Sequence, residues 1–345
     1  MSGNRKNNLG IDNQAVDNAA LEAMREEYGD RVRSLPPVAV VIAAYNEEGG
    51  IGPVISALPT AVCGLPTVTV VVADGCKDGT AQEARDHGAI VCDVPVNRGQ
   101  GAALRLGYRI AREGAAQYIV TTDADGQYNP AEIDTLLIPI VNGEADFVTG
   151  SRRLGSEETR DPVRRLGVRV FAVMISALTG QKISDTTFGL RAMRSEVTGA
   201  VRLDQQQYQA AELLIGVMCH GYRVLEKPAT IHKRKVGESK KGHNAIYGLH
   251  FLNVIARTWW RERILGGMSR RAGHAGAGQP ESITQPTSTA QPTSTAQSGQ
   301  PAGERGPVSP AGSSSSSASA SGTDVGLGIP APSASVDEPR SAKST

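Results

Sequence analysis

Two carboxylates and an amide follow a run of β-branched residues in the stretch YIVTTDADGQYNP, residues 118–130. Asp123, Asp125 and Gln127 alternate along the chain, so an extended backbone would point the three side chains the same way. Carboxylate and amide oxygens suit a hard divalent cation, Mg²⁺ or Mn²⁺, which in turn could hold a diphosphate. A calcium loop of the EF-hand type is excluded, because Gln127 and Tyr128 occupy its fifth and sixth positions. A solvated turn that begins the next helix remains the alternative to a metal site.

Two further turns carry polar groups after predicted strands. ADGCKDGT, residues 73–80, places Asp74 where a base and ribose could be hydrogen-bonded, although an ordinary Asp-Gly turn that caps the next helix explains the same letters. NRGQGAALRLG, residues 97–107, resembles a phosphate-binding loop at a helix start. However, Leu104 fills the last glycine position of GxGxxG, and the loop does not match GxxxxGK[ST]. A dehydrogenase or a kinase-like nucleotide triphosphatase therefore loses its main support.

Strands and short helices alternate through the part of the chain that contains these turns. Runs rich in Val and Ile predict buried strands at 37–46, 67–75, 89–96 and 116–126, with helices between them. Such a pattern predicts an α/β fold with a mostly parallel sheet and helices on both faces. Ligands of these sheets bind outside the carboxyl ends of the strands, so the chemistry is expected in the turns that follow them.

Composition divides the chain into three parts. Residues 1–35 are predicted to be an N-terminal extension with a short surface helix at 12–33, in which Leu21, Met24 and Tyr28 are spaced for one face. Residues 36–268 are predicted to form the folded domain. Residues 269–345 repeat QPTSTA and contain almost no large apolar side chain. They cannot bury enough surface to offset their ordering entropy, which predicts a disordered tail. The charges of the tail cancel, and the net charge of +1 gives no indication of nucleic-acid binding.

Cysteine usage and hydropathy bear on the cellular compartment. The four cysteines form no CxxC pair, and residues 1–10 lack the apolar core of a signal peptide. The longest apolar runs are less than half of the roughly 18 residues that suggest a membrane span. We therefore expect a protein of the reducing cytoplasm with no membrane-spanning segment.

A basic, amphipathic helix is predicted near the end of the folded domain, at about residues 244–264. Large apolar side chains are spaced for one face of this helix: Ile246, Leu249, Leu252, Ile255 and Trp259. Two tryptophans with flanking arginines are the composition expected of a helix that lies on an anionic membrane surface. Packing of the same face on the folded domain is the alternative.

Taken together and in this order, the motifs resemble those of family 2 glycosyltransferases, most closely the dolichyl-phosphate mannosyltransferase-like branch. The resemblance covers about residues 37–242 and rests on VVIAAYNEE, VVADGCKDGT, NRGQGAALRLG, TTDADGQYNPAEI, VTGSRR, DTTFGLRAM, QAAELLIGVMCHGYRVLEKP and KVGESK. It implies the GT-A fold for residues 36–268 and a hexose transfer, with inversion, from a nucleotide diphosphate sugar of the GDP-mannose or UDP-glucose type. A divalent cation is the implied cofactor, and a polyprenyl phosphate is the implied acceptor. Peripheral attachment to the inner face of the cell membrane is a further expectation.

The resemblance also implies roles for residues that match the family's motifs. The positions similar to donor-binding residues are Ala43, Tyr45, Glu47, Asp74, Asp123, Arg191 and Lys240. Asp123, Asp125 and Gln127 match the metal and diphosphate motif, where a cation would relieve the repulsion between the two carboxylates. The implied catalytic residues are Asp125, Asp185, Glu212 and Arg234, and the implied acceptor-binding residues are Arg152, Arg164 and Ser239.

Three positions depart from the family's pattern. Ala73 stands where the family usually has the first Asp of its paired-Asp element, and Cys76 replaces the Ser of that element. Both departures leave open which nucleotide base the donor carries. Val168 lies four residues after Arg164, where dolichyl-phosphate enzymes tend to carry a small hydroxyl residue, and this weakens the case for a phosphate acceptor.

The acceptor decides whether a general base is needed. A phosphate monoester is largely ionised at neutral pH and needs only positioning, whereas a hydroxyl acceptor needs a base, for which Asp185 and Glu212 are the candidates. Each carboxylate could instead pair with Arg191 or another nearby cation. Three other functions stay open: transfer to a soluble or polysaccharide hydroxyl, a non-catalytic nucleotide-sugar-binding module, and a nucleotidyltransferase. The last would need a Gly-rich loop after the first strand, where AAYNEE stands instead.

Overall fold

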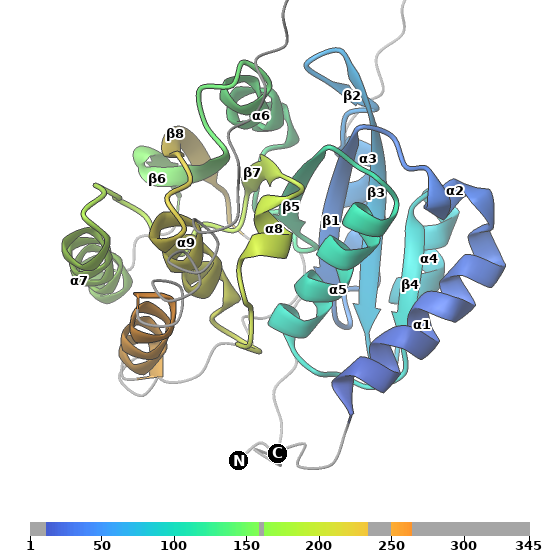
Figure 1. The fold of residues 1–345 in the computed structure, drawn as a ribbon. Coiled ribbons are helices and arrows are strands. Elements are labelled where there is room, and N and C mark those ends of the chain that lie inside the picture. The colour runs from blue at the N-terminus through green and yellow to red at the C-terminus, as the bar shows by residue number, and fades with distance from the viewer. Residues whose placement is uncertain (1–11, 159–161, 234–249, 264–345) are drawn as a thin grey trace, which may run out of the picture. The chain divides into compact units, whose positions relative to one another are not determined.

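An eight-stranded sheet with helices on both faces organises the described part of the chain (Figure 1). The computed structural model describes residues 12–158, 162–233 and 250–263. The strands are β1 (Val38–Ala44), β2 (Ala61–Val62), β3 (Leu65–Asp74), β4 (Ile90–Val94), β5 (Tyr118–Asp123), β6 (Phe147–Glu157), β7 (Arg191–Arg194) and β8 (Val224–Ile231).

The order of the strands across the sheet is β4-β3-β1-β5-β7-β6-β8, and β2 pairs with the start of β3. β4, β3, β1 and β5 are parallel to one another. β7 is antiparallel to both of its neighbours, and β8 is parallel to β6. The predicted α/β fold with a mostly parallel sheet is therefore confirmed.

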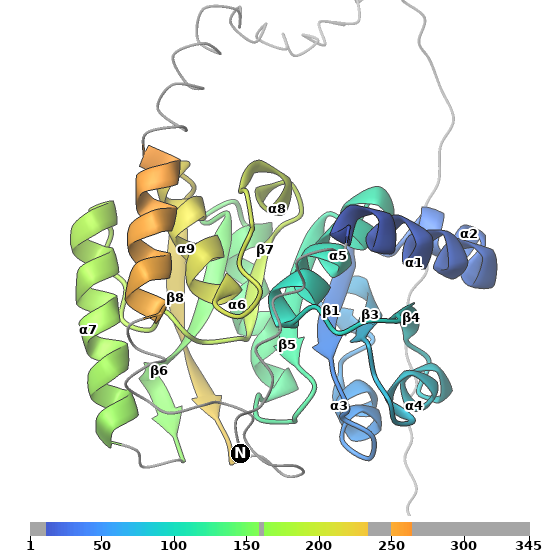
Figure 2. The same cartoon turned by 90° about the horizontal axis from the view of Figure 1, so that it is seen from below.

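The helices follow the strands in the alternation that the sequence predicts. They are α1 (Asn13–Tyr28), α2 (Asp30–Arg33), α3 (Ile51–Ala57), α4 (Thr80–Asp86), α5 (Gln100–Glu113), the 3₁₀ turn η1 (Pro130–Glu132), α6 (Ile133–Val141), α7 (Pro162–Thr179), α8 (Val197–Ala200) and α9 (Gln209–Cys219). A further helix spans residues 250–263 and is drawn in orange in Figures 1 and 2.

Two apolar clusters, one on each face of the sheet, form the core. Successive side chains of a strand point to opposite faces, so Ala39 and Val41 of β1 join the cluster under α1, α5 and α9. Val38, Val40 and Ile42 join the cluster under α3, α4 and α6. Figure 2 shows α1 and α5 on one side of β1 and β3, and α3 and α4 on the other. Because both faces of β1 are covered, its sequence reads as a continuous apolar run.

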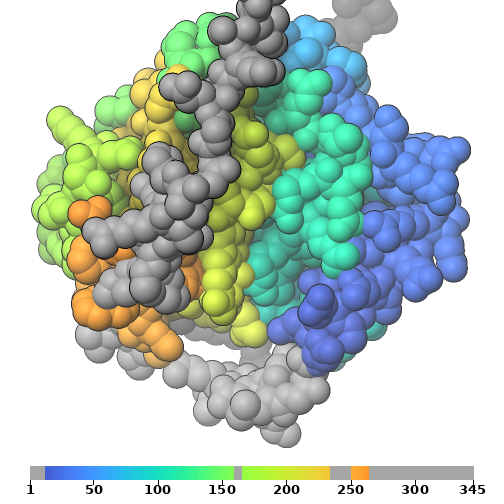
Figure 3. All heavy atoms as spheres, viewed as in Figure 1, coloured from blue at the N-terminus to red at the C-terminus, as the bar shows by residue number. Residues whose placement is uncertain are grey.

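Helix α1 is part of the folded core, which corrects the prediction of a surface helix in an N-terminal extension. Ala20, Leu21 and Met24 are buried in the first cluster, and the space-filling view shows α1 against α5 (Figure 3). The helix ends at Gly29, whose φ of 55° lies in the left-handed region that glycine adopts without strain. The predicted spacing of apolar residues on one helical face was right, but the surface location was wrong.

The helix at 250–263 packs on α7 and on the first cluster. Phe251 and Ile255 are buried, the rings of Phe171 and Phe251 lie 4.3 Å apart, and Trp259 Nε1 donates to the carbonyl of Leu178 at 2.8 Å. For this part of the predicted amphipathic helix, packing on the folded domain is the alternative that the structure supports. Ile246 and Leu249 lie outside the described residues.

Other sequence predictions also fall outside the described residues. They are the disordered tail, residues 269–345, and the loop residues Arg234, Ser239 and Lys240. Among the helices that the structure describes, none has the length and the apolar character that crossing a bilayer requires.

Gly107→Ala tests the packing of α5 on the sheet. A Cβ at Gly107 would lie 2.4 Å from Val41 Cγ1, so the new methyl group must displace part of the core. We expect the free energy of unfolding, measured in urea, to fall by about 1–3 kcal/mol.

The matched control is Gly167→Ala in α7, where the nearest atom to a new Cβ is 3.9 Å away. Helix propensity should leave this variant unchanged or more stable by up to about 1 kcal/mol. Equal effects of the two substitutions would contradict the close packing of α5.

Candidate functional site

The carboxyl ends of four parallel strands meet at one edge of the sheet and carry most of the predicted donor residues. Ala43 of β1 is aligned with Asp123 of β5, and Ala44 is aligned with Ala73 of β3. β3 in turn ends beside β4, because Asp74 is aligned with Val94. The turns that follow these strands therefore lie side by side, as the sequence predicted.

The turns after β1 and β3 are joined by hydrogen bonds between side chains and backbone. The N–H of Glu47 donates to Thr80 Oγ1 at 2.8 Å, and the N–H of Lys77 donates to Asn46 Oδ1 at 2.8 Å. Cys76 Sγ accepts from the N–H of Asn46 and donates to the last carbonyl of β1, both at 3.5 Å. The thiol thus makes the kinds of bond that a hydroxyl makes, so the departure at Cys76 keeps the two turns connected.

Tyr45 lies on the turn after β1, and its side chain is among the exposed apolar residues, at 36%. It precedes Asn46, whose φ of 50° gives the turn its left-handed step. An aromatic side chain that stands out from such a turn offers a flat surface to a ring.

Asp74 is the carboxylate of the paired-Asp element that faces the turn after β4. Its Oδ2 accepts the N–H groups of Arg98 at 2.8 Å and Gly99 at 2.7 Å. Burial raises the pKa of Asp74, and the two N–H groups and the guanidinium of Arg98 act against that rise. Ala73 points to the other face of the strand, into the second cluster, with no exposed surface. An Asp at that position would be buried among apolar side chains, so the departure at Ala73 suits this core.

The turn after β5 differs from the extended segment that the sequence predicted. β5 ends at Asp123, and residues 124–126 form a turn with Gly126 at a φ of 69°. Asp125 Oδ1 accepts the N–H of Gln127 at 3.1 Å, the local bond by which Asp favours turns. The expectation that an extended backbone aligns the three side chains is therefore wrong, because glycine and this bond fold the chain back.

The oxygens of this turn nevertheless fit a hard cation. Gln127 Nε2 donates to the carbonyl of His232 at 2.9 Å, which leaves the amide oxygen as the atom of that side chain suited to a metal. Asp123 Oδ1 accepts from Gln100 Nε2 at 3.0 Å. No group of three or more His, Cys, Asp or Glu side chains gathers for a metal within residues 12–158, 162–233 and 250–263. The predicted set has two carboxylates and an amide, a donor set with which Mg²⁺ or Mn²⁺ relies on water and substrate phosphates for its other ligands.

Gly189 and Tyr128 lie close to Asp123, and the sequence analysis did not single them out. The N–H of Gly189 donates to the hydroxyl of Tyr128 at 2.8 Å. A Cβ at Gly189 would lie 2.9 Å from Asp123 Oδ2 and 2.8 Å from that hydroxyl, so a side chain has no room. Burial raises the pKa of Tyr128, which keeps the hydroxyl neutral. The glycine in DTTFGLRAM was the available signal.

Asp185 pairs with Arg152 in the interior. Arg152 Nε donates to Asp185 Oδ2 at 2.6 Å, and both side chains are almost fully buried. Thr187 donates through its N–H to Asp185 Oδ1 at 3.1 Å, and the N–H of Asp185 itself donates to Glu226 at 2.8 Å. Of the two alternatives for Asp185, the structure shows the ion pair, with Arg152 rather than Arg191 as the partner. A predicted acceptor residue and a predicted base thus hold each other.

Glu212 and Arg191 also have partners within the protein. Glu212 is fully buried, accepts the N–H of Gln205 at 2.8 Å, and pairs with Arg261 Nη1 at 3.1 Å. Arg191 donates from Nε to the carbonyl of Phe188 at 2.7 Å and from Nη1 to the carbonyl of Ala210 at 2.8 Å. These contacts fix the segments around α9, and Arg191 itself is aligned with Thr121 of β5, two residues before Asp123.

The remaining predicted acceptor residue is on α7. Arg164 lies in the first turn of that helix, and its side chain is outside the described part of the structure. Val168, one turn further on, is buried at 6% exposure, so this position points toward the interior.

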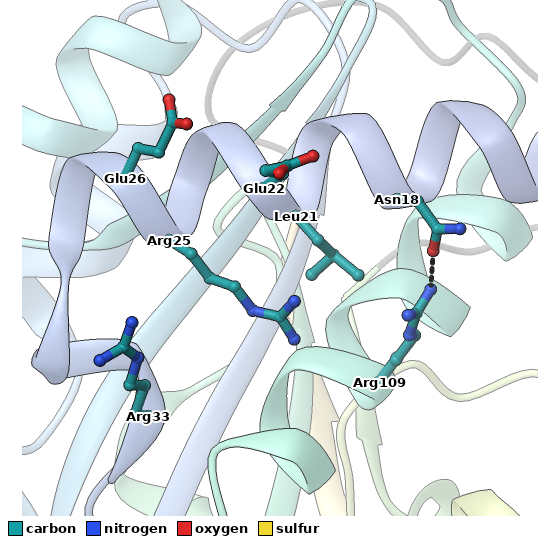
Figure 4. Close-up of a pocket in the computed structure, with 7 residues that line it drawn as sticks. All are labelled: Asn18, Leu21, Glu22, Arg25, Glu26, Arg33 and Arg109. Atoms are coloured by element: carbon teal, nitrogen blue, oxygen red, sulfur yellow. Dashed lines mark hydrogen bonds between the residues drawn. The ribbon is translucent and has the colours of Figure 1, made fainter.

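A hollow of about 490 Å³ lies between α1, α2 and α5 (Figure 4). None of the predicted site residues lines this hollow. The residues that line it are Asn18, Leu21, Glu22, Arg25, Glu26, Arg33 and Arg109. Charged side chains of both signs surround it, and it lies on helices rather than at strand ends. We assign it no part in the chemistry.

Comparison with known proteins decides the family. The model of glycosyl transferase family 2 matches residues 39–202. A dolichyl-phosphate hexose transferase of Haloferax volcanii is 33% identical over 208 residues, which are 59% of this chain and 86% of that protein. The chain belongs to glycosyl transferase family 2. The predictions of this family and of a hexosyltransferase are thereby confirmed.

Further relatives and solved structures agree with this family. A polyprenol monophosphomannose synthase of Mycolicibacterium smegmatis is 33% identical over 223 residues, 61% of this chain and 82% of that protein. Among solved structures, glucosyl-3-phosphoglycerate synthase of Mycobacterium tuberculosis in complex with Mn²⁺, UDP and phosphoglyceric acid matches with a TM-score of 0.52 and 18% identity. That match covers 74% of this chain and 84% of the other. It shows the fold, and the predicted GT-A-type fold of this glycosyltransferase is confirmed.

Asp185→Asn tests the buried ion pair of the glycosyltransferase. The substitution replaces the carboxylate nearest to the buried guanidinium of Arg152 by a neutral amide and leaves Glu157, at 3.6 Å from Nη1, as the weaker partner, so we expect the free energy of unfolding to fall by about 2–3 kcal/mol. Urea unfolding measures this change.

Asp30→Asn is the control, because the pair of Asp30 with Arg33 has side chains that are 95% and 71% exposed. Its effect should stay within about 0.5 kcal/mol. If Asp185→Asn abolished turnover at full stability, Asp185 would have to act as a base rather than as a partner of Arg152.

Proposed function

We propose that this family 2 enzyme transfers a hexose from a nucleotide diphosphate sugar to a polyprenyl phosphate, with inversion and with the help of a divalent cation. The observation that carries the proposal is the alignment of Ala43 with Asp123, which sets the turn after β1 beside the turn that contains the two carboxylates. Relatives named for transfer to dolichyl phosphate or for polyprenol monophosphomannose synthesis support the acceptor class.

The donor would bind along the edge of the sheet in the order of the strand ends. Tyr45, Glu47 and Asp74 would hold the base and ribose, and Asp123, Asp125 and Gln127 would face the diphosphate. A cation at these oxygens supplies positive charge to the leaving diphosphate. Arg234, Ser239 and Lys240, beyond the described residues, remain proposed phosphate and acceptor contacts, as Arg164 does on α7.

The reaction needs one bond to form and one to break. An acceptor oxygen bonds to the anomeric carbon, and the electron pair of the breaking bond leaves with the nucleoside diphosphate. A phosphate monoester brings an oxygen that is already ionised, so no proton has to be removed. Asp185 and Glu212, the candidate bases, have arginine and backbone partners in the structure. This arrangement favours a phosphate acceptor over the alternative of a hydroxyl acceptor.

An apolar and basic surface on two neighbouring helices favours a membrane as the place of the reaction. Leu166, Val170 and Val173 of α7 are 63%, 51% and 70% exposed, and their spacing puts them on one face. On the helix at 250–263, which lies beside α7 in Figures 1 and 2, Trp260 is 63% exposed and Leu252 is 36% exposed. Clusters of exposed apolar side chains mark interaction sites.

The charges around these side chains indicate which kind of partner this surface binds. α7 contains no Asp or Glu, and its exposed arginines include Arg165 and Arg169. Arg257 and Arg263 are exposed on the other helix. An apolar face flanked by arginines fits an anionic lipid surface. We therefore propose the exposed faces of these two helices as the membrane-facing surface. Of the apolar stripe predicted from the sequence, Leu252 belongs to this surface, whereas Ile255 is buried in the core.

Thermal shift with UDP and GDP, each with and without Mn²⁺, tests the donor site. One nucleotide should raise the Tm, and Mn²⁺ should enlarge the rise because the diphosphate and the carboxylates share the cation. Asp125→Asn should lose the Mn²⁺-dependent part of the shift and reduce turnover at least about a hundredfold, at an unchanged Tm without ligand.

Asp86→Asn, the same chemical change on α4, is the control and should behave as the parent does. A fully active Asp125→Asn variant would contradict the cation site. Nucleotide binding without transfer to either a polyprenyl phosphate or a polyprenol would favour the non-catalytic module, and transfer to the polyprenol alone would favour the hydroxyl acceptor.

Flotation with vesicles that contain anionic phosphatidylglycerol tests the membrane-facing surface. The double variant Val170→Glu, Val173→Glu should bind about tenfold less or weaker still, since each valine withheld from lipid forfeits roughly 1 kcal/mol. Ile138→Glu on α6 is the control, because Ile138 is also exposed, at 47%, but lies on another helix. Equal binding by both variants and the parent would contradict this surface.

A further inference from the structure

Arg98 is a buried cation between the donor turns and the N-terminal helix. Its side chain is only 1% exposed. Nη1 donates to Asp17 Oδ1 and, at 3.5 Å, to the carbonyl of Asn13, and both of these acceptors belong to α1. Nη2 is buried and has no hydrogen-bond partner among the described residues. The guanidinium is therefore held mainly by α1.

The two oxygens of Asp74 are held unequally. Oδ2 accepts two backbone N–H groups, from Arg98 at 2.8 Å and from Gly99 at 2.7 Å. Oδ1 has Arg98 Nε at 3.4 Å, which is long for a hydrogen bond between charged groups. Backbone groups thus fix the carboxylate in place, while the guanidinium makes only a weak contact with its second oxygen.

Close packing keeps this arrangement rigid. A Cβ at Gly75 would lie 2.1 Å from the backbone nitrogen of Asn97, so the turn after β3 touches the turn after β4 directly. The N–H of Gly101 donates to the carbonyl of Gln206 at 2.7 Å, which fixes the start of α5 on the other side. Arg98 can therefore change partners by rotating its side chain, but its backbone has little freedom to move.

The helix that holds Arg98 lies before the part of the chain that matches the family. The family model begins at residue 39, whereas α1 spans Asn13–Tyr28. Its apolar side chains account for its packing, but Asp17 is a charged residue with 23% of its side chain exposed, next to a buried guanidinium. The negative charge of Asp17 attracts the buried guanidinium of Arg98, which the apolar packing of α1 alone would not do.

We propose that Asp17 is a positioning residue for the sugar donor, because it draws the Arg98 guanidinium toward α1 and so leaves Asp74 Oδ1 to accept a ring N–H of the nucleotide base. The inference rests on the proposed function of Asp74 in binding that base. Without the charge of Asp17, the buried guanidinium faces a single carboxylate, and attraction in a region of low dielectric turns it onto Asp74 Oδ1. The base then meets an oxygen that is already engaged.

Asp17→Asn tests this inference in the full chain. Binding of the preferred nucleotide, measured by calorimetry, should weaken about tenfold, the amount expected for one hydrogen bond to a charged group. The KM for the donor should rise by a similar factor, with kcat nearly unchanged. Asp17→Glu restores the charge and should recover most of the affinity.

Asn18→Ala is the matched control on the same helix. Asn18 Oδ1 accepts from Arg109 of α5 at 2.8 Å, a contact between α1 and α5 that does not involve the donor turns (Figure 4). This variant should lower the Tm by about as much as Asp17→Asn does, and it should keep the nucleotide affinity of the parent. An equal loss of affinity in both variants would mean that α1 acts only through general stability, and would overturn the proposal.

The double variant Asp17→Asn, Arg98→Gln shows whether Asp17 acts through Arg98. In the Arg98→Gln background, Asp17→Asn should cause no further loss of affinity, since the competing cation is gone. This comparison also serves if Asp17→Asn alone does not fold, because the double variant contains no buried guanidinium that lacks its carboxylate, and the backbone N–H groups of residues 98 and 99 still hold Asp74. A further loss of affinity in the double variant would overturn the inference.

Asp74→Asn separates this inference from the proposed function. If Asp74→Asn leaves nucleotide affinity unchanged, the assignment of Asp74 to the base fails, and the inference fails with it. If Asp74→Asn weakens binding while Asp17→Asn does not, the donor site stands and only the role of Asp17 is refuted.

Discussion

The parallel register of β1, β3, β4 and β5 is the constraint on which the rest of the molecule depends. Helices cover both faces of these strands, so a polar side chain can reach a ligand only where a strand ends. The aligned pairs at the ends of neighbouring strands bring those positions to one edge. Asp74 and Asp123 are the last residues of β3 and β5, and Tyr45 follows β1 directly. The location of the site thus follows from the parallel register of these strands and from the helices that cover both faces of the sheet.

The carboxylates of the interior and those at the strand ends have different functions in this enzyme. Asp185 and Glu212 have arginine partners and backbone donors, an arrangement that fixes the segments they join. Asp123 and Asp125 stand at a strand end and in the turn after it, where an incoming cation would find oxygen ligands. An enzyme whose interior acids are committed to structure suits an acceptor that arrives with its own negative charge. The proposed phosphate acceptor is consistent with this division.

The sequence predicted the sheet and the strand-end turns, because both follow from local patterns of apolar residues and glycine. It also predicted one apolar face for α1. A 3.6-residue period of apolar side chains indicates that one face of a helix is buried, but it does not identify the residues against which that face packs. The pairs Asp185 with Arg152 and Arg261 with Glu212 join residues 33 and 49 positions apart, and no local pattern records such contacts. The prediction of an extended chain at Asp125 was wrong, because Gly126 adopts a positive φ and the Asp125 side chain bonds the N–H of Gln127, neither of which follows from the alternation of polar residues.

The two ends of the sheet meet different physical demands, and β7 separates them. On the side of β1, β3 and β4, side chains hold neighbouring turns together by short hydrogen bonds, as Thr80 Oγ1 does by accepting the N–H of Glu47, which suits a rigid and charged donor. Beyond β6 and β8, α7 and the helix at 250–263 bury one face against each other and leave Val173 and Trp260 open. Apolar side chains in that position gain stability only when something removes them from water. A lipid surface would do so while presenting the proposed polyprenyl phosphate, so the apolar exposure and the proposed acceptor chemistry would share one explanation.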